Sequence, residues 1–277
     1  MNPQVTETTH SKGRKSHVAR FATAGALADW TIGRQDHTTQ LNWTGGETLA
    51  AARQSARVGL PSAVAAAERL LDQVNVQGIQ TYRPRWQADV YGAMPDVPRY
   101  VAGAPDCMMR PDRRESESAP VRLFADCCVS AAVSAATMRA RGNAMLALAI
   151  KLSQCRQVEL WVYADLGGHD GTAVIPMVAI PTSPLDLAAA SYALTAPAFL
   201  RQLCMTYTDS HPSYTGAWAW GESPTTSGVP GAYETRLREV LGAEPEDVVL
   251  GGGHIDNRLI RQPVEWVTEQ LQRYVNA

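Results

Sequence analysis

Apolar residues recur at helical spacing in the first part of the chain. Between Pro61 and Val74 they stand at positions 63, 66, 67, 70 and 71, and a proline suits the first turn of a helix. The same kind of spacing predicts helices over residues 20–31 and 47–58, each closed by a glycine that follows it. We therefore predict a helical N-terminal region.

The limits of that region come from changes in composition. The polar residues 1–18 show no periodicity and are predicted to form a flexible tail. Residues 82–111 are rich in glycine and proline but carry many apolar side chains, so we expect a loop that packs against the body of the protein. Residues 110–119 are charged and contain serines, which is typical of an exposed connector. The helical region is thus placed at 19–111, and a second region at 120–277.

The second region alternates between short apolar runs and helical periodicity. Strands are predicted over residues 121–128, 158–164, 173–180 and 247–250. Helices are predicted over residues 137–152, 185–205 (disturbed at Pro197), 232–241 and 263–275. Such alternation is typical of βαβ units, which build a sheet with helices on both faces. We predict an α/β fold with a mostly parallel sheet.

Composition limits the partners and the cellular location that we expect for the protein. The 25 basic and 27 acidic residues give a formal net charge of -2, which leaves no overall field to hold a polyanion, so nucleic acid is not indicated as a partner. The sequence shows neither an apolar run long enough for a membrane span nor the apolar centre of a secretion signal. Five cysteines without a C-x-x-C pair favour reduced thiols. We expect a cytoplasmic protein that makes no contact with membranes.

Carboxylates gather at the predicted carboxyl ends of the strands, where open α/β sheets bind ligands. Asp126 and Asp165 end the first two strands, Asp209 follows the long helix, and the last strand runs into residues 251–256, which include Asp256. Several carboxylates at one edge are able to hold a hard cation such as Mg²⁺ or Mn²⁺ through their oxygens. The alternative interpretation is a purely structural role, in which Asp126 caps the turn after its strand.

The segment Asp126-Cys127-Cys128-Val129-Ser130 resembles the Asp-x-Ser-x-Ser signature of von Willebrand factor A-type domains, and the order of elements after residue 120 resembles that fold as well. The resemblance implies a divalent-metal site with Asp126 and Ser130 as ligands, completed by later residues such as Thr182 and Asp209. Cys128 stands where the first serine belongs, and a thiol is a poor ligand for magnesium. A degenerate, metal-free site is the competing interpretation, in which Ser130 caps the next helix.

A wider resemblance covers about residues 40–275. It rests on Asp89-Val90-x-Gly92 and on Asp96-Val97-Pro98-Arg99-Tyr100-x-Ala102-Gly103-x-Pro105-x-Cys107-Met108, together with shorter matches on both sides. These motifs look like an uncharacterised family of bacteriophage and prophage proteins, a domain of unknown function. The resemblance implies a phage-related origin, and therefore the cytoplasm of a bacterial host, but no activity.

The sequence supports two functional hypotheses. The first is a non-catalytic interaction or assembly module whose partner is another protein, bound beside Asp126, Asp209 and the aromatic residues of the loop 211–221. Those aromatics have a plainer interpretation, which is that they hold the loop to its own core. The second hypothesis is a divalent-metal-dependent enzyme acting on phosphoesters through Asp126 and neighbouring carboxylates. The chain contains neither a G-x-S-x-G nor an H-E-x-x-H motif, so no catalytic nucleophile or zinc-hydrolase helix is indicated.

Overall fold

The computed structural model of the chain describes residues 2–9, 15–74, 86–92, 94–111, 120–129, 132–155, 157–167, 172–182, 184–212, 232–250 and 258–275. Its strands are β1 (Gln4–Thr9), β2 (Lys15–Phe21), β3 (Trp86–Asp89), β4 (Met94–Pro95), β5 (Met108–Pro111), β6 (Val121–Asp126), β7 (Val158–Tyr163), β8 (Leu166–Gly167), β9 (Ala173–Ile180) and β10 (Val248–Leu250). Its helices are α1 (Ala24–Trp30), α2 (Leu41–Thr44), α3 (Leu49–Val58), α4 (Pro61–Leu71), α5 (Val97–Val101), α6 (Ala135–Cys155), α7 (Leu187–Thr195), the π-helical η2 (Phe199–Cys204), α8 (Met205–Asp209), α9 (Ala232–Leu241), α10 (Arg258–Arg261) and α11 (Pro263–Val275).

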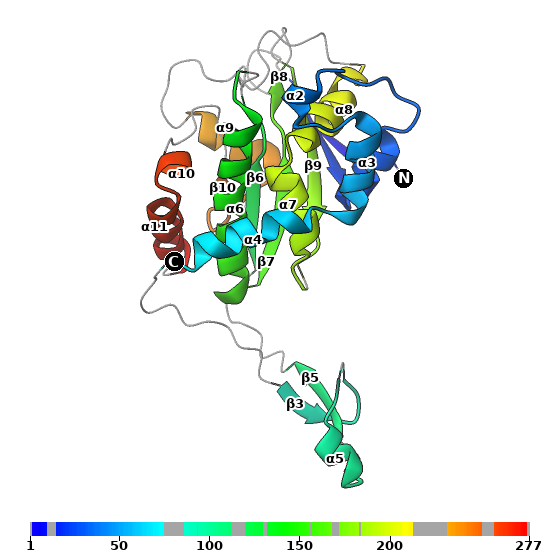
Figure 1. Cartoon of the computed structure of the whole chain (residues 1–277), viewed down its shortest axis with the longest axis vertical. Coiled ribbons are helices and arrows are strands. Elements are labelled where there is room, and N and C mark those ends of the chain that lie inside the picture. Colours follow the sequence, from blue (N-terminus) through cyan, green and yellow to red (C-terminus); the bar gives the residue numbers. More distant parts are fainter. Residues whose placement is uncertain are drawn as a thin grey trace.

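A large mixed sheet forms the centre of the protein (Figure 1). Its strand order is β1-β2-β9-β7-β6-β10, with β8 paired to β9. Strand β6, which lies next to the edge strand β10, is parallel to both of its neighbours, β7 and β10, whereas β9 is antiparallel to β7. Farther out, β2 is parallel to β9 and β1 is antiparallel to β2. The predicted α/β class is confirmed, and the sheet is mixed: β7, β6 and β10 form a parallel run at one side, and the antiparallel pair of β9 and β7 lies in the middle.

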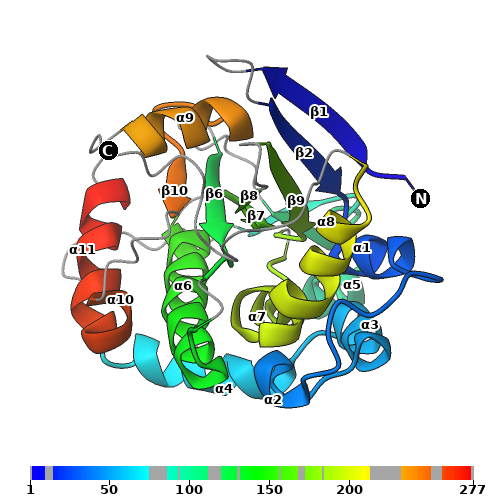
Figure 2. The same ribbon diagram turned by 90° about the horizontal axis from the view of Figure 1, so that it is seen from above.

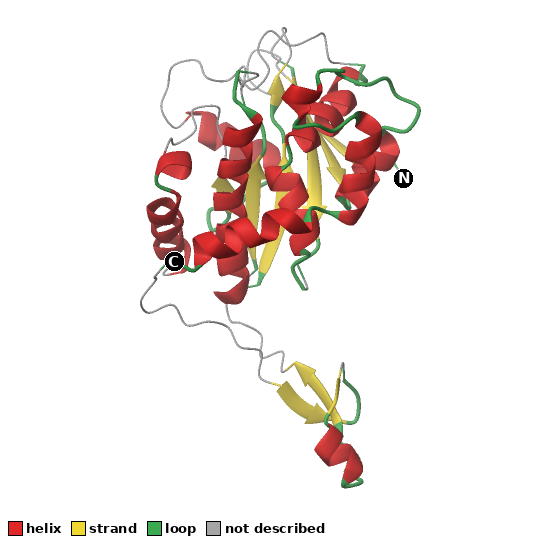
Figure 3. Cartoon of the chain, viewed as in Figure 1, coloured by secondary structure: helices red, strands yellow, loops and turns green. Residues whose placement is uncertain are grey.

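The two faces of the sheet carry different amounts of helix. Successive residues of a strand point to opposite faces, so Leu123 and Ala125 of β6 belong to the larger core, which includes buried residues of α1, α3, α6, α7 and α11. Phe124 belongs to a smaller cluster on the other face, which α9 covers with Leu237 and Leu241. Figure 2 shows α9 on one side of the sheet and α6, α7 and α4 on the other. In Figure 3, where helices are red and strands are yellow, the helices surround the strands of the large sheet.

The central helix α6 is enclosed between the sheet and a second layer of helix. Residues 144–150 of α6 are all buried, because α6 packs on β7 and is crossed on its outer side by α4. A helical segment that is apolar on every side, such as residues 144–150, is stable only where it is buried on every side. The close approach of α7 requires glycine at position 142, since a Cβ there would overlap the backbone carbonyl of Leu194.

The predicted long helix over 185–205 is broken, as expected, at Pro197. Helix α7 ends at Thr195, and Ala196 adopts an extended conformation with φ of -82° and ψ of 120°. Steric contact with a following proline disfavours the helical conformation in the preceding residue, so the break falls there. The chain then continues through η2 into α8, and every described side chain of these two helices except Asp209 is buried.

The N-terminal segment corrects two predictions. Residues 4–21 were expected to be partly a flexible tail and partly the start of a helix, but they form the hairpin β1–β2, in register from Gln4↔Arg20 to Thr9↔Lys15. Strand β2 adds to the edge of the sheet beside β9 and buries Val18 and Phe21. Helix α1 begins only at Ala24, after the side chain of Thr23 accepts a hydrogen bond from the backbone of Ala26.

Residues 86–111 also correct a prediction. Instead of a loop packed on the body, they form the antiparallel sheet β3-β5-β4 with the short helix α5, which we call the three-stranded unit. Figure 1 shows this unit apart from the large sheet. Side chains expected beneath the loop are exposed, among them Tyr100 at 68% and Val101 at 78%. The connections 75–85 and 112–119 lie outside the described residues.

Candidate functional site

The strand order of the large sheet reverses at β6. From β6 the chain runs through α6 to β7 on one side, whereas the later strand β10 lies on the other side. Open α/β sheets bind ligands at such a point, outside the carboxyl ends of the strands, because the connections diverge there. Asp126 is the last residue of β6, and Asp165 comes two residues after the end of the parallel strand β7. The structure therefore brings these two carboxylates to the same edge, as predicted.

Asp126 is fixed in a turn. Its side chain is only 2% exposed, and its Oδ1 accepts a hydrogen bond of 2.7 Å from the backbone N–H of Cys128. The backbone N–H of Cys127 donates to the carbonyl of Tyr163 at 2.8 Å, which joins the turn to the end of β7. The bond to Cys128 is the one that the turn-capping interpretation predicts.

The start of α6 is capped by a residue other than the one predicted. Ser130 lies outside the described residues. The hydroxyl of Ser134 accepts a hydrogen bond of 3.1 Å from the backbone N–H of Thr137, and the hydroxyls of the two residues are 2.9 Å apart. Ser134 thus satisfies one of the free N–H groups at the first turn of α6.

The two cysteines after Asp126 are protonated thiols. Burial is the main cause that raises the pKa of Cys127 well above its ordinary value, and a side-chain hydrogen bond with Cys204 adds to it. Burial also raises the pKa of Cys128, followed by the negative charge of Asp126 and, more weakly, that of Asp165. A thiol kept protonated at neutral pH is neither a good nucleophile nor a metal ligand. The two cysteines are core residues, as the sequence predicted.

A buried arginine adds positive charge to this edge. Arg141 lies on α6 and is 6% exposed, and its charge lowers the pKa of both Cys127 and Cys128. The carboxylates of Asp126 and Asp165 act on Cys128 in the opposite direction. Arg141 and the two aspartates therefore act on the same buried thiol with opposite charge.

The structure shows the surroundings of Asp209 and Thr182, the other two predicted ligands. Asp209, at the end of α8, contacts His37, whose Nδ1 is 2.5 Å from Oδ2 of the aspartate. Helix α8 packs on β9, which is separated from β6 by β7. Because β9 is antiparallel to β7, it carries Thr182 to the opposite edge of the sheet from Asp126.

The metal site therefore stays a prediction. Among the residues that the structure describes, no group of three or more His, Cys, Asp or Glu side chains is placed to hold a metal ion. The loop 213–231 with most of its aromatics lies outside the described residues, as do His254 and Asp256.

Sequence reasoning missed a buried arginine in η2. Arg201 donates to the carbonyl of Trp43 at 2.7 Å and to that of Val133 at 2.5 Å, and its guanidinium stacks 4.6 Å from the Trp43 ring. Burial lowers the pKa of Arg201 to about 10. This side chain ties α2 to the turn before α6. Its signal in the sequence is a charge in an otherwise apolar helical run.

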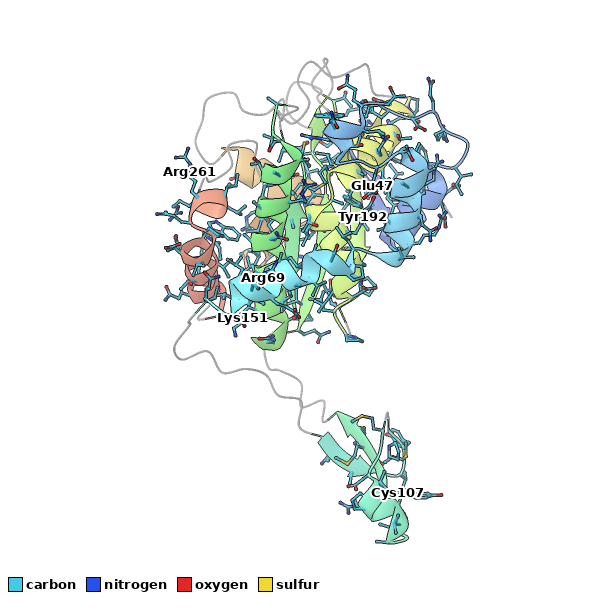
Figure 4. The ribbon with its side chains drawn as sticks, viewed as in Figure 1. Glu47, Arg69, Cys107, Lys151, Tyr192 and Arg261 are labelled. Atoms are coloured by element: carbon cyan, nitrogen blue, oxygen red, sulfur yellow. The ribbon has the colours of Figure 1, made fainter. Side chains whose placement is uncertain are left out.

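The N-terminal helices are joined to the body by a second buried contact. The hydroxyl of Tyr192 on α7 donates to the carbonyl of Ala52 at 3.0 Å and to the carboxylate of Glu47 at 3.3 Å (Figure 4). Burial raises the pKa of Glu47 and raises that of Tyr192 well above its ordinary value. The contact is structural and explains why the N-terminal helices belong to the body.

The largest group of exposed apolar side chains lies in the three-stranded unit. Six of the ten large hydrophobic residues that are exposed in the described chain fall within residues 90–101, and we call them the apolar patch: Val90, Tyr91, Met94, Val97, Tyr100 and Val101. The remaining four are scattered over residues 5–58. The sequence had indicated apolar residues here but placed them beneath a loop.

The charged residues of the unit are paired within it. Arg99 lies 2.8 Å from Asp106, and Arg110 lies 2.7 Å from Asp89. The side chain of Asp96 accepts a hydrogen bond from the backbone N–H of Arg99 and so caps α5. These five are the charged residues of the unit's described part, and each has a partner inside the unit.

A protein-family model matches residues 9–270, and its description is Domain of unknown function (DUF7192). No curated protein and no solved structure matches the chain. The matched range runs from the end of β1 into α11 and includes the three-stranded unit, so a single family covers both parts. In the described part of the chain, none of the helices has the length and apolar character needed to cross a membrane.

Proposed function

We propose that this chain, which belongs to the family described as Domain of unknown function (DUF7192), is a non-catalytic interaction module that binds another protein through its apolar patch. The observation that carries the proposal is the exposure of the patch, in which Tyr100 and Val101 are more than two thirds accessible to solvent. Large exposed apolar patches on soluble proteins mark interaction sites, and tyrosine and methionine are enriched at such sites.

The unit lacks a core of its own, which supports the same proposal. None of the side chains described between residues 87 and 110 reaches the burial of the main core. A small sheet without a covered hydrophobic face is only marginally stable in water. A partner that covers the apolar patch would therefore stabilise the unit as well as bind it.

The paired charges indicate the chemistry of the partner. Four of the five charged side chains described in the unit form two ion pairs, and Asp96 is engaged as the cap of α5, so the patch offers little charge for a partner to match. The partner surface is therefore expected to be apolar, and binding to it should depend weakly on salt, unlike binding between oppositely charged surfaces.

The body fits the role of a rigid support. The von Willebrand A-like interpretation is supported by the antiparallel direction of β9 and by Asp126 at the end of β6, the strand at which the strand order reverses. The protonated thiols beside Asp126 favour a structural edge over a catalytic one. A cytoplasmic location and a phage-related origin are compatible with such a module and stay predictions.

Site-specific photocrosslinking in cells of the source organism tests this proposal. A photoreactive phenylalanine analogue replaces Tyr100 in the full chain, and in a matched control it replaces Val58, which is 59% exposed on α3 of the body. We expect a discrete protein adduct from position 100 only, and its loss when Val101→Asp is added. Equal adducts from both positions, or none from position 100, would contradict the proposal.

A metal-dependent enzyme acting on phosphoesters is the second candidate. It is favoured by one observation, the charges of Asp126 and Asp165 that both act on Cys128 at the edge of the sheet. Two carboxylates close to one point are the usual ligands of Mg²⁺ or Mn²⁺, which could polarise a phosphoryl oxygen. The metal site can be tested on the purified chain.

A thermal-shift titration with Mg²⁺ and Mn²⁺ separates the two candidates. A ligand at about a hundred times its Kd stabilises the folded state by roughly 2.7 kcal/mol, which raises Tm by several degrees in a chain of this size. A rise in the wild type that is lost in Asp126→Asn would support the metal site. No rise in either protein would remove the observation that favours the enzyme.

A further inference from the structure

We infer that Arg141 anchors a binding site for the carboxylate group of a small polar molecule, at the edge of the large sheet where β6 ends. The inference goes beyond the proposed function, because it concerns the body and does not involve the apolar patch. It is carried by the burial of an arginine that has no hydrogen-bond partner and by the charged groups at the same edge.

Arg141 is buried without a partner. The residue is only 6% exposed, and its Nε is shielded from solvent. Within the part of the chain that the structure describes, its guanidinium takes part in no hydrogen bond and no ion pair. Burying a charged group costs free energy unless the group is paired and hydrogen-bonded. A bound molecule that supplies an acceptor to the guanidinium explains why the charge is kept there.

Arg201, the other arginine that is buried in the described chain, shows how the same core satisfies a structural guanidinium. Its two terminal nitrogens donate to the carbonyls of Trp43 and Val133, and its guanidinium stacks on the ring of Trp43. Its Nε alone has no partner. The whole donor fork of Arg141, in contrast, remains for a planar acceptor such as a carboxylate.

The side chain of Arg141 is directed toward the edge where β6 ends. Side chains of a helix lean toward its N-terminus, and α6 begins at Ala135, after the turn that follows β6. Burial raises the pKa of Cys127 and of Cys128 in that turn, and the charge of Arg141 is close enough to lower both. The strand order reverses at β6, which is where open α/β sheets bind ligands.

The neighbouring charges select the class of ligand. Asp126 and Asp165 act on the same thiol of Cys128 as Arg141 does, so an anion at this edge comes near two carboxylates. A phosphate group carries about two negative charges and is repelled about twice as strongly as a carboxylate. A carboxylate carries one charge and fits the guanidinium through two parallel hydrogen bonds. A hydroxyl or ammonium group on the same molecule would find an acceptor in the aspartates. We therefore expect a small hydroxy acid or amino acid.

The inference is tested by thermal-shift titration of the purified full chain at constant pH and ionic strength. The probes are glycolate, glycine, acetate and inorganic phosphate. We expect a saturating rise in Tm of several degrees with glycolate or glycine, a smaller rise with acetate and the smallest with phosphate. The rise should be lost in Arg141→Met, which keeps an unbranched side chain but removes the charge. Arg139→Met is the matched control, because Arg139 lies on the same helix and is exposed. A general solvent effect of a probe would act on all three proteins alike.

The Tm of the ligand-free proteins separates a binding role from a structural one. A buried charge without a partner destabilises the folded chain, so Arg141→Met should melt at the temperature of the wild type or above it. If the aspartates needed Arg141 as a counter-charge, the same variant would melt several degrees lower. Arg141→Lys keeps the charge but loses the planar fork, and it should bind the carboxylate probe roughly tenfold more weakly.

Four results would overturn the inference. They are a wild-type chain without a saturating rise for any carboxylate probe, a rise that survives Arg141→Met, a larger rise with phosphate than with the carboxylates, and a ligand-free Arg141→Met chain that is clearly less stable than the wild type. None of these results bears on the photocrosslink from position 100. A failure here therefore leaves the interaction module standing, and a failed photocrosslink leaves the carboxylate site standing.

Discussion

The body around the large sheet and the three-stranded unit are stabilised in different ways. In the body, Leu146 and Leu148 of α6 are completely buried, and the helix is covered by the sheet on one side and by α4 on the other. In the unit, the described side chains are at most partly buried, and its contacts are hydrogen bonds and ion pairs. Burial stabilises the body, whereas the unit leaves its apolar surface available.

Magnitudes sharpen this contrast. An exposed ion pair contributes about 0–1 kcal/mol, whereas removing a buried leucine side chain costs about 2–5 kcal/mol. The two ion pairs of the unit therefore cannot replace a core. The stability of the body is its own, and that of the unit depends on whatever covers the apolar patch.

The largest expected effect is in the body, at Gly142. Gly142→Ala places a Cβ against the backbone carbonyl of Leu194, which cannot move without shifting α7, so we expect a loss of about 3 kcal/mol or more. The matched variant Gly103→Ala, in the unit, has open space around its Cβ and costs about 1 kcal/mol through its positive φ alone. Thermal unfolding followed by circular dichroism measures both. A Gly142→Ala protein with wild-type Tm would show that α6 and α7 are not closely packed.

Truncating apolar side chains gives the next effect. Leu148→Ala leaves a cavity in the larger core and should cost about 2–5 kcal/mol. Val101→Ala removes an exposed side chain and should change the unfolding of the body by less than about 0.5 kcal/mol. Chemical denaturation of both variants at low protein concentration tests this. Equal losses would mean that the unit and the body unfold as one cooperative core.

The smallest expected effect is a loss of stability at acidic pH through His211. His211 packs on His17 with ring centroids 4.8 Å apart, and burial first, then the charge of His17, lowers the pKa of His211 below 6.5. The unfolded chain then binds this proton at a higher pH than the folded chain. Stability from this group is therefore fully present above pH 6.5 and falls as the pH drops toward the folded pKa.

His211→Gln should remove that part of the acid sensitivity. The surroundings of the pair are Glu7, whose Oε2 is 3.4 Å from Nδ1 of His17, and Lys15, which is paired with Glu7. Because Glu7 offsets part of the added charge, the expected change is a modestly shallower fall of Tm between neutral and mildly acidic pH. Identical Tm profiles for the two proteins would contradict the role given to His211.

Predictions from the sequence succeeded where the apolar pattern is local. The bounds of β9 and α11 are those that the pattern predicts, and the helix break falls beside Pro197. In each case a run of neighbouring residues carries the information, through side-chain period or through the steric effect of proline. The same holds for Asp126 and Asp165, which follow recognisable buried strands and therefore reach the same edge.

Predictions failed where distant segments decide the structure. Strand β1 is polar at almost every position and is a strand only because β2 pairs with it, while β2 is held by β9, more than 150 residues away. Thr182 was considered beside Asp126, but the antiparallel direction of β9 moves it to the opposite edge. The sequence pattern also gave no sign that Asp209 meets His37, 172 residues away along the chain, whereas its role as a metal ligand stays a prediction.

The sequence by itself determined the α/β class, most elements after residue 120 and the position of Asp126 and Asp165 at one edge of the sheet. Apolar periodicity and the effects of glycine and proline on the backbone act over a few neighbouring residues, so the sequence pattern is enough to show them. Tertiary structure decided the N-terminal hairpin, the pairing of Asp209 with His37 and the exposure of Val97, Tyr100 and Val101. Strand pairing and burial depend on which distant segments meet. The sequence alone does not distinguish an apolar residue that is buried beneath a loop from one that is exposed on the surface.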